Sequence, residues 1–235
     1  MLKQKFKRIF LALDTNKLSS AIKTVALLKN DLAGIKVGKE LFSYFGPEII
    51  RKLKKFKLPI FLDLKFHDIP TTVYRSVKAI NMIKPNYLSV HSLGGNKMIG
   101  AAVRGSKYTK ILAVSLLSHH DQKSLREIGI TGSFKNEIQK LINNALKNNV
   151  HGLILAPKDL EIISKLKKNN IEIFVPGIRS KQNRKDDHKR FLDPKTAIKK
   201  GATYIIIGRP ITKSKNPKKT LTLINEEIKE FLIKE

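Results

Sequence analysis

Short apolar runs alternate with longer amphipathic stretches along the whole chain of 235 residues. The apolar runs are rich in Ile, Val, Leu and Phe and have the length of β-strands. In the longer stretches the apolar residues recur every three or four positions, which is the period of an α-helix. We expect strands at residues 8–14, 34–38, 60–65, 87–91, 111–117, 152–156, 171–177 and 204–208. We expect helices at residues 17–30, 39–54, 71–83, 95–105, 134–148, 158–168, 194–200 and 218–233.

This order of elements predicts an α/β protein. Eight strand–helix units in a chain of this length are typical of a closed (β/α)8 TIM barrel. No Pro- or Ser-rich linker and no internal repeat interrupts the series, so we expect a single domain over residues 1–235. An open, doubly wound sheet stays an alternative, because the number of strands does not by itself establish closure.

The composition excludes several classes of protein. The chain contains no cysteine, which excludes disulfides and zinc sites built on thiolates. The basic start leads into a short apolar run that lacks the longer apolar segment and small-residue cleavage site of a signal peptide. No run of about 18 apolar residues is present to span a membrane. We therefore expect a soluble protein of the cytoplasm.

The net charge of +28 raises the question of a nucleic-acid partner. A nucleic-acid footprint is expected on one face or in one tail, whereas Lys and Arg are spread here through most of the predicted helices, as at residues 51–57, 164–168 and 213–219. Many Asn and Ile accompany them, as in chains encoded by AT-rich DNA. We therefore favour compositional drift, with a general attraction for anionic substrates as a by-product.

Polar residues close most of the predicted strands. In a (β/α)8 barrel the reacting groups lie at the carboxyl ends of the strands and in the loops just beyond them. A single Asp after a strand is often a helix N-cap, and for Asp14 taken alone we favour that interpretation. The N-cap interpretation becomes weaker when the polar residues at the other strand ends are considered with Asp14, because all of them are directed to the same end of the barrel. They are Asp14, Lys36, Asp63, Lys65, His91, Ser92, Ser118, Pro176, Gly177, Gly208 and Arg209.

The stretch FLDLKFHDIP at residues 61–70 places charges in an otherwise buried strand. Because side chains alternate along a strand, Asp63 and Lys65 share one face, while Leu62, Leu64 and Phe66 share the other. A structural ion pair is the simpler interpretation, but burying two charges contributes little to stability. With a further carboxylate and a further lysine, an alternating Lys–Asp–Lys–Asp array is better explained as a device for tuning a proton.

Several motifs together resemble the orotidine 5′-phosphate decarboxylase family. They are LALD, IKVGKELF, FLDLKFHDIPTT, VHSLGG, FVPGIRS and IIIGRPITKS, and they run in the family's order from about residue 8 to the C-terminus. The resemblance implies decarboxylation of orotidine 5′-monophosphate to UMP and CO2, the last step of de novo pyrimidine synthesis. It also implies that neither a metal nor an organic cofactor takes part, and that the protein is a homodimer with shared active sites.

The resemblance also implies roles for the charged residues. Lys65 would lie beside C6 of the pyrimidine, stabilise the developing negative charge and deliver the proton. Asp63 would lie near the departing carboxylate, Lys36 would complete the charged network and Asp14 would hold the ribose. Asp68 would reach into the neighbouring subunit's site, and two further residues of the same string would also cross the dimer interface. These two are Ile69 and Thr72.

The resemblance also assigns the residues that bind the phosphate. They lie in the loops after the seventh and eighth predicted strands, where barrels of this kind often bind phosphate. Gly208, Arg209 and Arg179 match the family's phosphate-binding residues, while Ser118 and Pro176 would line the pyrimidine pocket. His188 stands in the string DDHKR where the family usually has Gln, so either His188 or the nearby Gln182 would contact the phosphate. The long connection from residue 178 onward predicts a closing lid, in which Lys181, Arg184 and Lys185 are expected to be solvated.

Two other functions stay open. A metal-dependent sugar-phosphate enzyme of the same superfamily shares D-x-K-x-x-D, but such relatives tend to carry a Glu metal ligand at the end of the second strand, where this chain has Lys36. A basic nucleic-acid-binding barrel would show steep salt dependence and no need for Asp63 or Lys65. His67, His91 and His119 form no metal-ligand pattern and are expected to be structural. No G-x-S-x-G motif supports a serine hydrolase.

Overall fold

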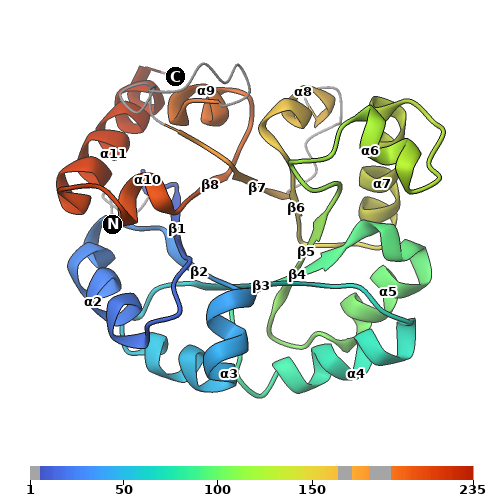
Figure 1. Ribbon diagram of the computed structural model, residues 1–235, viewed down its shortest axis with the longest axis horizontal. Coiled ribbons are helices and arrows are strands. Elements are labelled where there is room, and N and C mark those ends of the chain that lie inside the picture. Colours follow the sequence, from blue (N-terminus) through green and yellow to red (C-terminus); the bar gives the residue numbers. More distant parts are fainter. Residues whose placement is uncertain (1–5, 164–170, 180–191, 235) are drawn as a thin grey trace.

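The strands form a closed barrel. The computed structural model describes residues 6–163, 171–179 and 192–234. Eight parallel strands pair in chain order, and β1 pairs with β8 to close the ring, so the open-sheet alternative is wrong (Figure 1). The strands are β1 Ile9–Leu13, β2 Gly34–Gly38, β3 Ile60–Phe66, β4 Tyr87–His91, β5 Lys110–Val114, β6 Gly152–Ile154, β7 Glu172–Pro176 and β8 Tyr204–Ile207.

Helices surround this barrel. The α-helices are α2 Leu18–Leu28, α3 Lys39–Lys54, α4 Pro70–Ile80, α5 Gly95–Gly105, α6 Gln122–Glu127, α7 Phe134–Lys147, α8 Leu160–Ile163, α9 Pro194–Lys199, α10 Arg209–Thr212 and α11 Pro217–Lys234. Single 3-10 turns lie at η1 Lys29–Asp31, η2 Ser92–Gly94 and η3 Pro157–Asp159.

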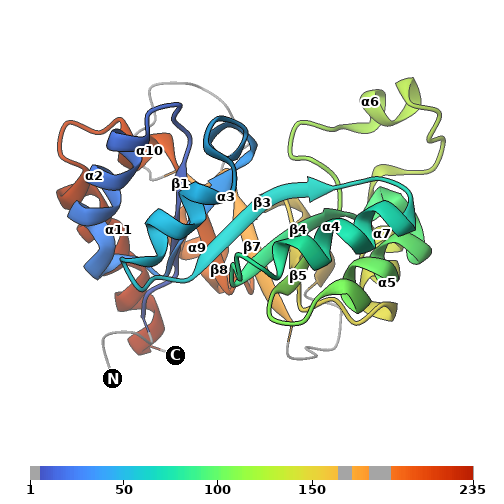
Figure 2. The ribbon, with the colours of Figure 1, turned by 90° about the horizontal axis from the view of Figure 1, so that it is seen from below.

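The expected helices are confirmed to within a few residues, except that the helix expected at 158–168 is described only to Ile163. Two short helices, α6 and α10, were not expected. Figure 2 shows α6 raised above the barrel, on the side opposite the chain termini. Among the described residues, no helix is long and apolar enough to cross a membrane.

Two apolar layers hold the barrel together. The outer layer packs the strands against the helices and contains Leu11, Leu62 and Val90 among many others. The inner layer fills the barrel with rings that meet mostly edge-to-face, at centroid distances such as 5.1 Å between Phe10 and Phe174. Its buried members are Phe10, Ala12, Phe61, Tyr87, Leu112, Val114, Ile154, Phe174 and Ile206.

The inner layer also fixes where a ligand can bind. Phe10 and Phe61 come early in their strands, so the rings fill the end of the barrel where the strands begin. At that same end, the Tyr87 hydroxyl donates to Glu172 at 3.2 Å, and Lys110 lies 3.1 Å from the same carboxylate. Space for a ligand is therefore left at the opposite end, where the strands finish.

Candidate active site

A cavity of about 800 Å³ opens at the carboxyl ends of the strands. It is lined by residues from every strand except β4 and from several of the loops that follow them, so residues far apart in the sequence meet here as the strand-end pattern predicted. The predicted residues among its lining are Asp14, Lys36, Asp63, Lys65, Ser118, Pro176, Gly177, Arg179, Gly208 and Arg209.

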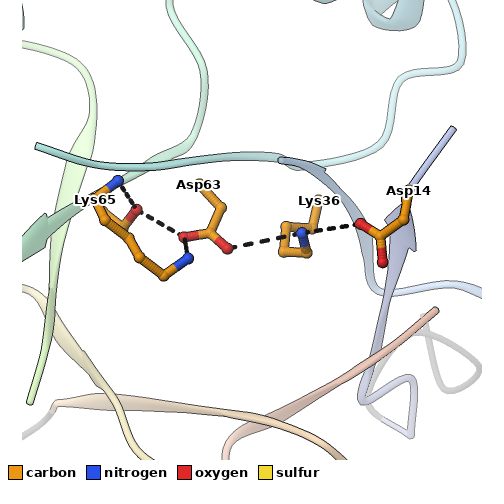
Figure 3. A network of polar contacts seen from close by, with 5 residues as sticks. Asp14, Lys36, Asp63 and Lys65 are labelled. Atoms are coloured by element: carbon orange, nitrogen blue, oxygen red, sulfur yellow. Dashed lines mark hydrogen bonds and ion pairs between the residues drawn. The ribbon is translucent and has the colours of Figure 1, made fainter. Parts of the chain in front are cut away.

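Four of these residues form a line of alternating charge across the cavity, as Figure 3 shows. The Lys65 ammonium donates to Oδ1 of Asp63 at 2.8 Å. Lys36 Nζ lies 3.7 Å from Oδ2 of Asp63 and 3.5 Å from Oδ1 of Asp14. Each lysine thus has a carboxylate beside it, and Asp63 lies between the two lysines. The line contains Lys36, Asp63 and Lys65 of the predicted Lys–Asp–Lys–Asp array, but its further carboxylate in this chain is Asp14, and Asp68 is not part of it.

Asp63 is the most buried member of this line. Burial by itself would raise the pKa of its carboxyl. The positive charges of Lys36 and Lys65, with hydrogen bonds from Lys65 and Ser89, outweigh that effect and hold the pKa below its ordinary value of 3.8. Asp63 is therefore an anion at neutral pH, held in a buried position between two cations.

The backbone of β3 is distorted where it presents these charges. The pairing of β3 with β4 passes from Leu62 opposite Leu88 to Phe66 opposite Val90, so four residues of β3 advance against two of β4. Within this bulge Lys65 has a φ of 51°, in the left-handed region that L-residues rarely adopt. Asp63 and Lys65 both point to the inside of the barrel, as predicted. This orientation depends on the bulge as well as on the regular alternation of side chains along a strand.

Asp14 does not cap a helix. The helix that follows it, α2, begins at Leu18 with Lys17 in the N-cap position, so the interpretation of Asp14 as an N-cap is wrong. Its carboxylate faces Lys36 instead. Two glycines leave room for it: an added Cβ at Gly208 would lie 3.0 Å from Oδ2 of Asp14, and one at Gly38 would lie 3.0 Å from Lys36 Nζ.

Asp68, Ile69 and Thr72 lie away from the charged line. None of the three lines the cavity, and all three are exposed, Ile69 to 66% of its surface. Oδ1 of Asp68 accepts a hydrogen bond from the backbone N–H of Ile69 at 2.6 Å. The helix α4 starts directly afterwards at Pro70, as predicted. An isolated chain therefore presents these side chains to solvent.

The expected phosphate and base contacts are partly described. Arg179 follows β7 and Arg209 follows β8, and both line the cavity with Ser118 and Pro176. The ends of the long connection meet, since Ile178 bridges to Leu192 and the N–H of Arg179 donates to the carbonyl of Leu192 at 3.2 Å. The other residues predicted in this connection lie outside the described part of the chain; they are His188, Gln182, Lys181, Arg184 and Lys185.

Two of the three histidines stack beside the site without forming a metal centre. His67 and His91 stack at 5.4 Å between ring centroids, and Nδ1 of His91 accepts from the N–H of Leu93 at 3.3 Å. Burial, with nearby positive charges, lowers the pKa of His91 to about 4, so its ring is neutral at pH 7. Within the described ranges, no three His, Asp or Glu side chains gather as metal ligands.

Comparison with known proteins places this barrel in a family. A family model described as orotidine 5′-phosphate decarboxylase / HUMPS matches residues 7–224. The chain belongs to this family. A protein of Nitrosomonas eutropha named orotidine 5′-phosphate decarboxylase is 39% identical over 223 residues, which make up 94% of this chain and 96% of that protein.

Solved structures of the family share the fold. The orotidine 5′-phosphate decarboxylase of Lactobacillus acidophilus is 30% identical with a TM-score of 0.82, and that of Pyrococcus horikoshii is 29% identical with a TM-score of 0.78. Each comparison covers 94% of this chain and 99% of the other. The predicted resemblance to the orotidine 5′-phosphate decarboxylase family is thus confirmed.

Two residues of the site in this family member were not predicted from the sequence. Lys39, directly after β2, lines the cavity with the predicted lysines. Ser89 in β4 is fully buried and hydrogen-bonds both Asp63 and Lys65. A signal for Ser89 was present, because it is a polar residue at the inward position of the strand YLSVH, between Tyr87 and His91.

Proposed function

We propose that this chain is an orotidine 5′-phosphate decarboxylase, a carbon–carbon lyase that converts orotidine 5′-monophosphate into UMP and CO2 in pyrimidine synthesis. The observation that carries the proposal is the line Asp14–Lys36–Asp63–Lys65 at the mouth of a barrel of this family. Relatives named for this activity cover nearly the whole chain.

The reaction needs a cation where an electron pair is left behind. When the bond between C6 and the carboxylate breaks, CO2 departs and the pair stays at C6 of the pyrimidine. Lys65 is the group we assign to this position. Its ammonium stabilises the developing charge and then gives a proton to C6, where it stays. The lysine, left as a neutral amine, takes a new proton from water. Asp63 fixes Lys65 from 2.8 Å away, and the substrate carboxylate would enter beside it.

Asp63 can act in two ways. As a fixed anion it repels the substrate carboxylate, which raises the energy of the bound ground state. As a partner of two lysines it also preorganises the cations that stabilise the transition state. Either effect requires Asp63 to be ionised, and its lowered pKa provides for this at neutral pH.

Binding energy at the phosphate supplies what the charged line cannot. Enzymes lower barriers by about 8–23 kcal/mol, whereas one well-placed charged contact contributes about 3–4 kcal/mol. The remainder includes binding energy from groups remote from C6. Arg179 and Arg209 line the same cavity as Lys65, and an arginine fork suits a phosphate. We assign them, with Gly208, to the 5′-phosphate.

The shared site accounts for the exposed end of the D-x-K-x-x-D string. Asp68, Ile69 and Thr72 lie outside their own cavity and face solvent. In a homodimer they would enter the partner's cavity, and Asp68 would add a carboxylate to the line there. This assignment depends on assembly into a dimer.

Loss of substrate absorbance tests the proposal. Purified protein with EDTA present should deplete orotidine 5′-monophosphate rapidly, and Lys65→Ala should lower kcat by about 10²–10³-fold or more. Lys57→Ala is a matched control, because Lys57 is an exposed lysine with a similar left-handed backbone, φ 55°. Absence of turnover by the folded wild type, or turnover of a sugar phosphate that requires added metal, would overturn the proposal.

A further inference from the structure

Ser89 occupies the centre of the support behind the charged line. It lies in the middle of β4 with none of its surface exposed, and it is not among the residues that line the cavity. Its hydroxyl donates to Oδ1 of Asp63 at 2.8 Å and accepts from the backbone N–H of Lys65 at 2.8 Å. Oδ1 of Asp63 also accepts from Lys65 Nζ, so one oxygen joins all three residues.

The side chain of Ser89 replaces backbone pairing at the bulge of β3. Regular pairs between β3 and β4 stop after Leu62 and resume only at Phe66. The N–H of Lys65, turned by its positive φ, finds the Ser89 hydroxyl in place of a backbone carbonyl. Because this hydroxyl accepts from the backbone, its own proton is directed at the carboxylate of Asp63. A single side chain therefore couples the backbone of Lys65 to the carboxylate of Asp63.

We infer that Ser89 is a positioning residue for the proton donor: it fixes the distance and orientation of Lys65 relative to Asp63 without contacting the substrate. This inference rests on the proposed function, since it assigns Ser89 to the step in which Lys65 acts. The expected effect is on kcat, because Ser89 holds the reacting end of the cavity. The phosphate contacts come from the loops after β7 and β8, so KM should change little.

The chain offers a matched control. Ser115 follows β5 and is as buried as Ser89, but no hydrogen-bond partner is described for its hydroxyl. Ser89→Ala and Ser115→Ala therefore remove the same atom from similar surroundings, and only the first breaks contacts with the charged line. Ser89→Cys fills the space left by Ser89→Ala with a weaker donor and acceptor, which covers the case in which the alanine variant does not fold.

The first readout is the split between kcat and KM. Ser89→Ala should lower kcat about 10- to 100-fold, as expected for loss of a hydrogen bond to a charged group. Its KM for orotidine 5′-monophosphate should stay within about threefold of wild type, since uniform binding is not affected. The kcat of Ser89→Cys should lie between those of Ser89→Ala and the wild type, and the kcat of Ser115→Ala should match that of the wild type. Rates are normalised to folded protein measured by circular dichroism.

The second readout is the pH profile of kcat. Around Asp63 stand Lys36 from β2 and Lys65 from β3, with Asp14 beyond Lys36 and His91 of β4 within electrostatic range of Lys65. Removing the Ser89 hydrogen bond should raise the pKa of Asp63. The acid limb of the profile should therefore move to higher pH in Ser89→Ala and stay in place in Ser115→Ala.

Different outcomes separate the two proposals. If the wild type does not decarboxylate the substrate, the proposed function fails and the assignment of Ser89 fails with it. If the wild type is active but Ser89→Ala or Ser89→Cys keeps the wild-type kcat and pH profile, the positioning role alone is wrong. A lower melting temperature with unchanged kcat per folded molecule would likewise reduce Ser89 to a structural residue.

Discussion

Lys65 carries strain in its own backbone. A non-glycine residue with positive φ costs on the order of 1–3 kcal/mol, and such residues persist only where the surroundings over-determine them. Around Lys65 those surroundings are the Ser89 hydroxyl on its N–H and the Asp63 carboxylate on its ammonium. Lys57, Lys84 and Asn149 also have positive φ, but none of them lines the cavity. Among the described non-glycine residues with positive φ, Lys65 is therefore the one that lines the cavity.

The single buried ring of His91 makes the free energy of unfolding depend on pH. Its pKa is lowered from 6.5 to about 4 by burial and by nearby positive charge. In the unfolded chain His91 therefore binds a proton as the pH falls below 6.5, whereas in the folded chain it binds one only near pH 4. Since the unfolded state binds more protons in this window, the free energy of unfolding falls as the pH falls from 6.5 toward 4.

His91→Asn tests this. It removes the titrating ring and keeps an oxygen that can accept from the N–H of Leu93. The wild type should lose on the order of 1–2 kcal/mol of unfolding free energy between pH 7 and pH 4.5 beyond what His91→Asn loses, after allowance for solvent screening. Urea unfolding at the two pH values measures the difference. Parallel losses in the two proteins would contradict a neutral, buried His91.

At the scale of elements, β1 and β2 pack closely because one glycine has no side chain. An added Cβ at Gly34 would lie 2.3 Å from Cε1 of Phe10 and 2.7 Å from the backbone oxygen of Pro59. Gly34→Ala should therefore lower the free energy of unfolding by about 1–3 kcal/mol through overpacking. Denaturant unfolding gives the value.

A double variant supplies the control for Gly34. Phe10→Leu replaces the ring that the new methyl group meets by a shorter side chain. The double variant Phe10→Leu with Gly34→Ala should therefore lose less free energy of unfolding than the sum of the two single changes. Relief should be partial, since the backbone of Pro59 does not move out of the way. Additive losses would show that the close approach of β1 and β2 does not limit packing here.

The elements differ in how well the sequence predicted them. The eight strands and the long helices follow from apolar period alone, so their bounds are confirmed to within a few residues. The helices α6 and α10 have six and four residues, too few for a period to show, and α6 is fixed by an Asp121 capping box instead. The strand-end pattern located the cavity. The bulge of β3 and the role of Ser89 depend on contacts between strands, which no single stretch of sequence records.

For the whole molecule, the net charge of +28 and the cavity point to the same class of ligand. The cavity gathers Lys36, Lys39, Lys65, Arg179 and Arg209, while Asp14 and Asp63 are its only acidic lining among the described residues. Such a mouth attracts anions, which suits the phosphate and the carboxylate of the proposed substrate. The general positive charge assists this attraction without requiring a nucleic-acid partner.

Assembly is the remaining property at this scale, and mixing two inactive variants tests it. Lys65→Ala and Asp68→Asn should each lose activity, the second about 10²-fold if its carboxylate completes the line in the partner's cavity. In a mixed dimer, one cavity combines the intact Lys65 of one chain with the intact Asp68 of the other. Random exchange at equal amounts should restore about a quarter of the sites, because half of the dimers are mixed and each has one complete cavity.

Asp68→Asn suits this test because the amide oxygen can still accept from the N–H of Ile69, as Oδ1 of Asp68 does at 2.6 Å, so the start of α4 is left undisturbed. The control mixes Lys65→Ala with a chain that carries both changes, where no combination yields a complete cavity. Recovery near a quarter of wild-type activity in the first mixture, and none in the second, requires Asp68 to act across subunits. Absence of recovery in both, with exchange verified by mass spectrometry, would place Asp68 in the site of its own chain. Wild-type activity of Asp68→Asn by itself would place Asp68 outside the reaction.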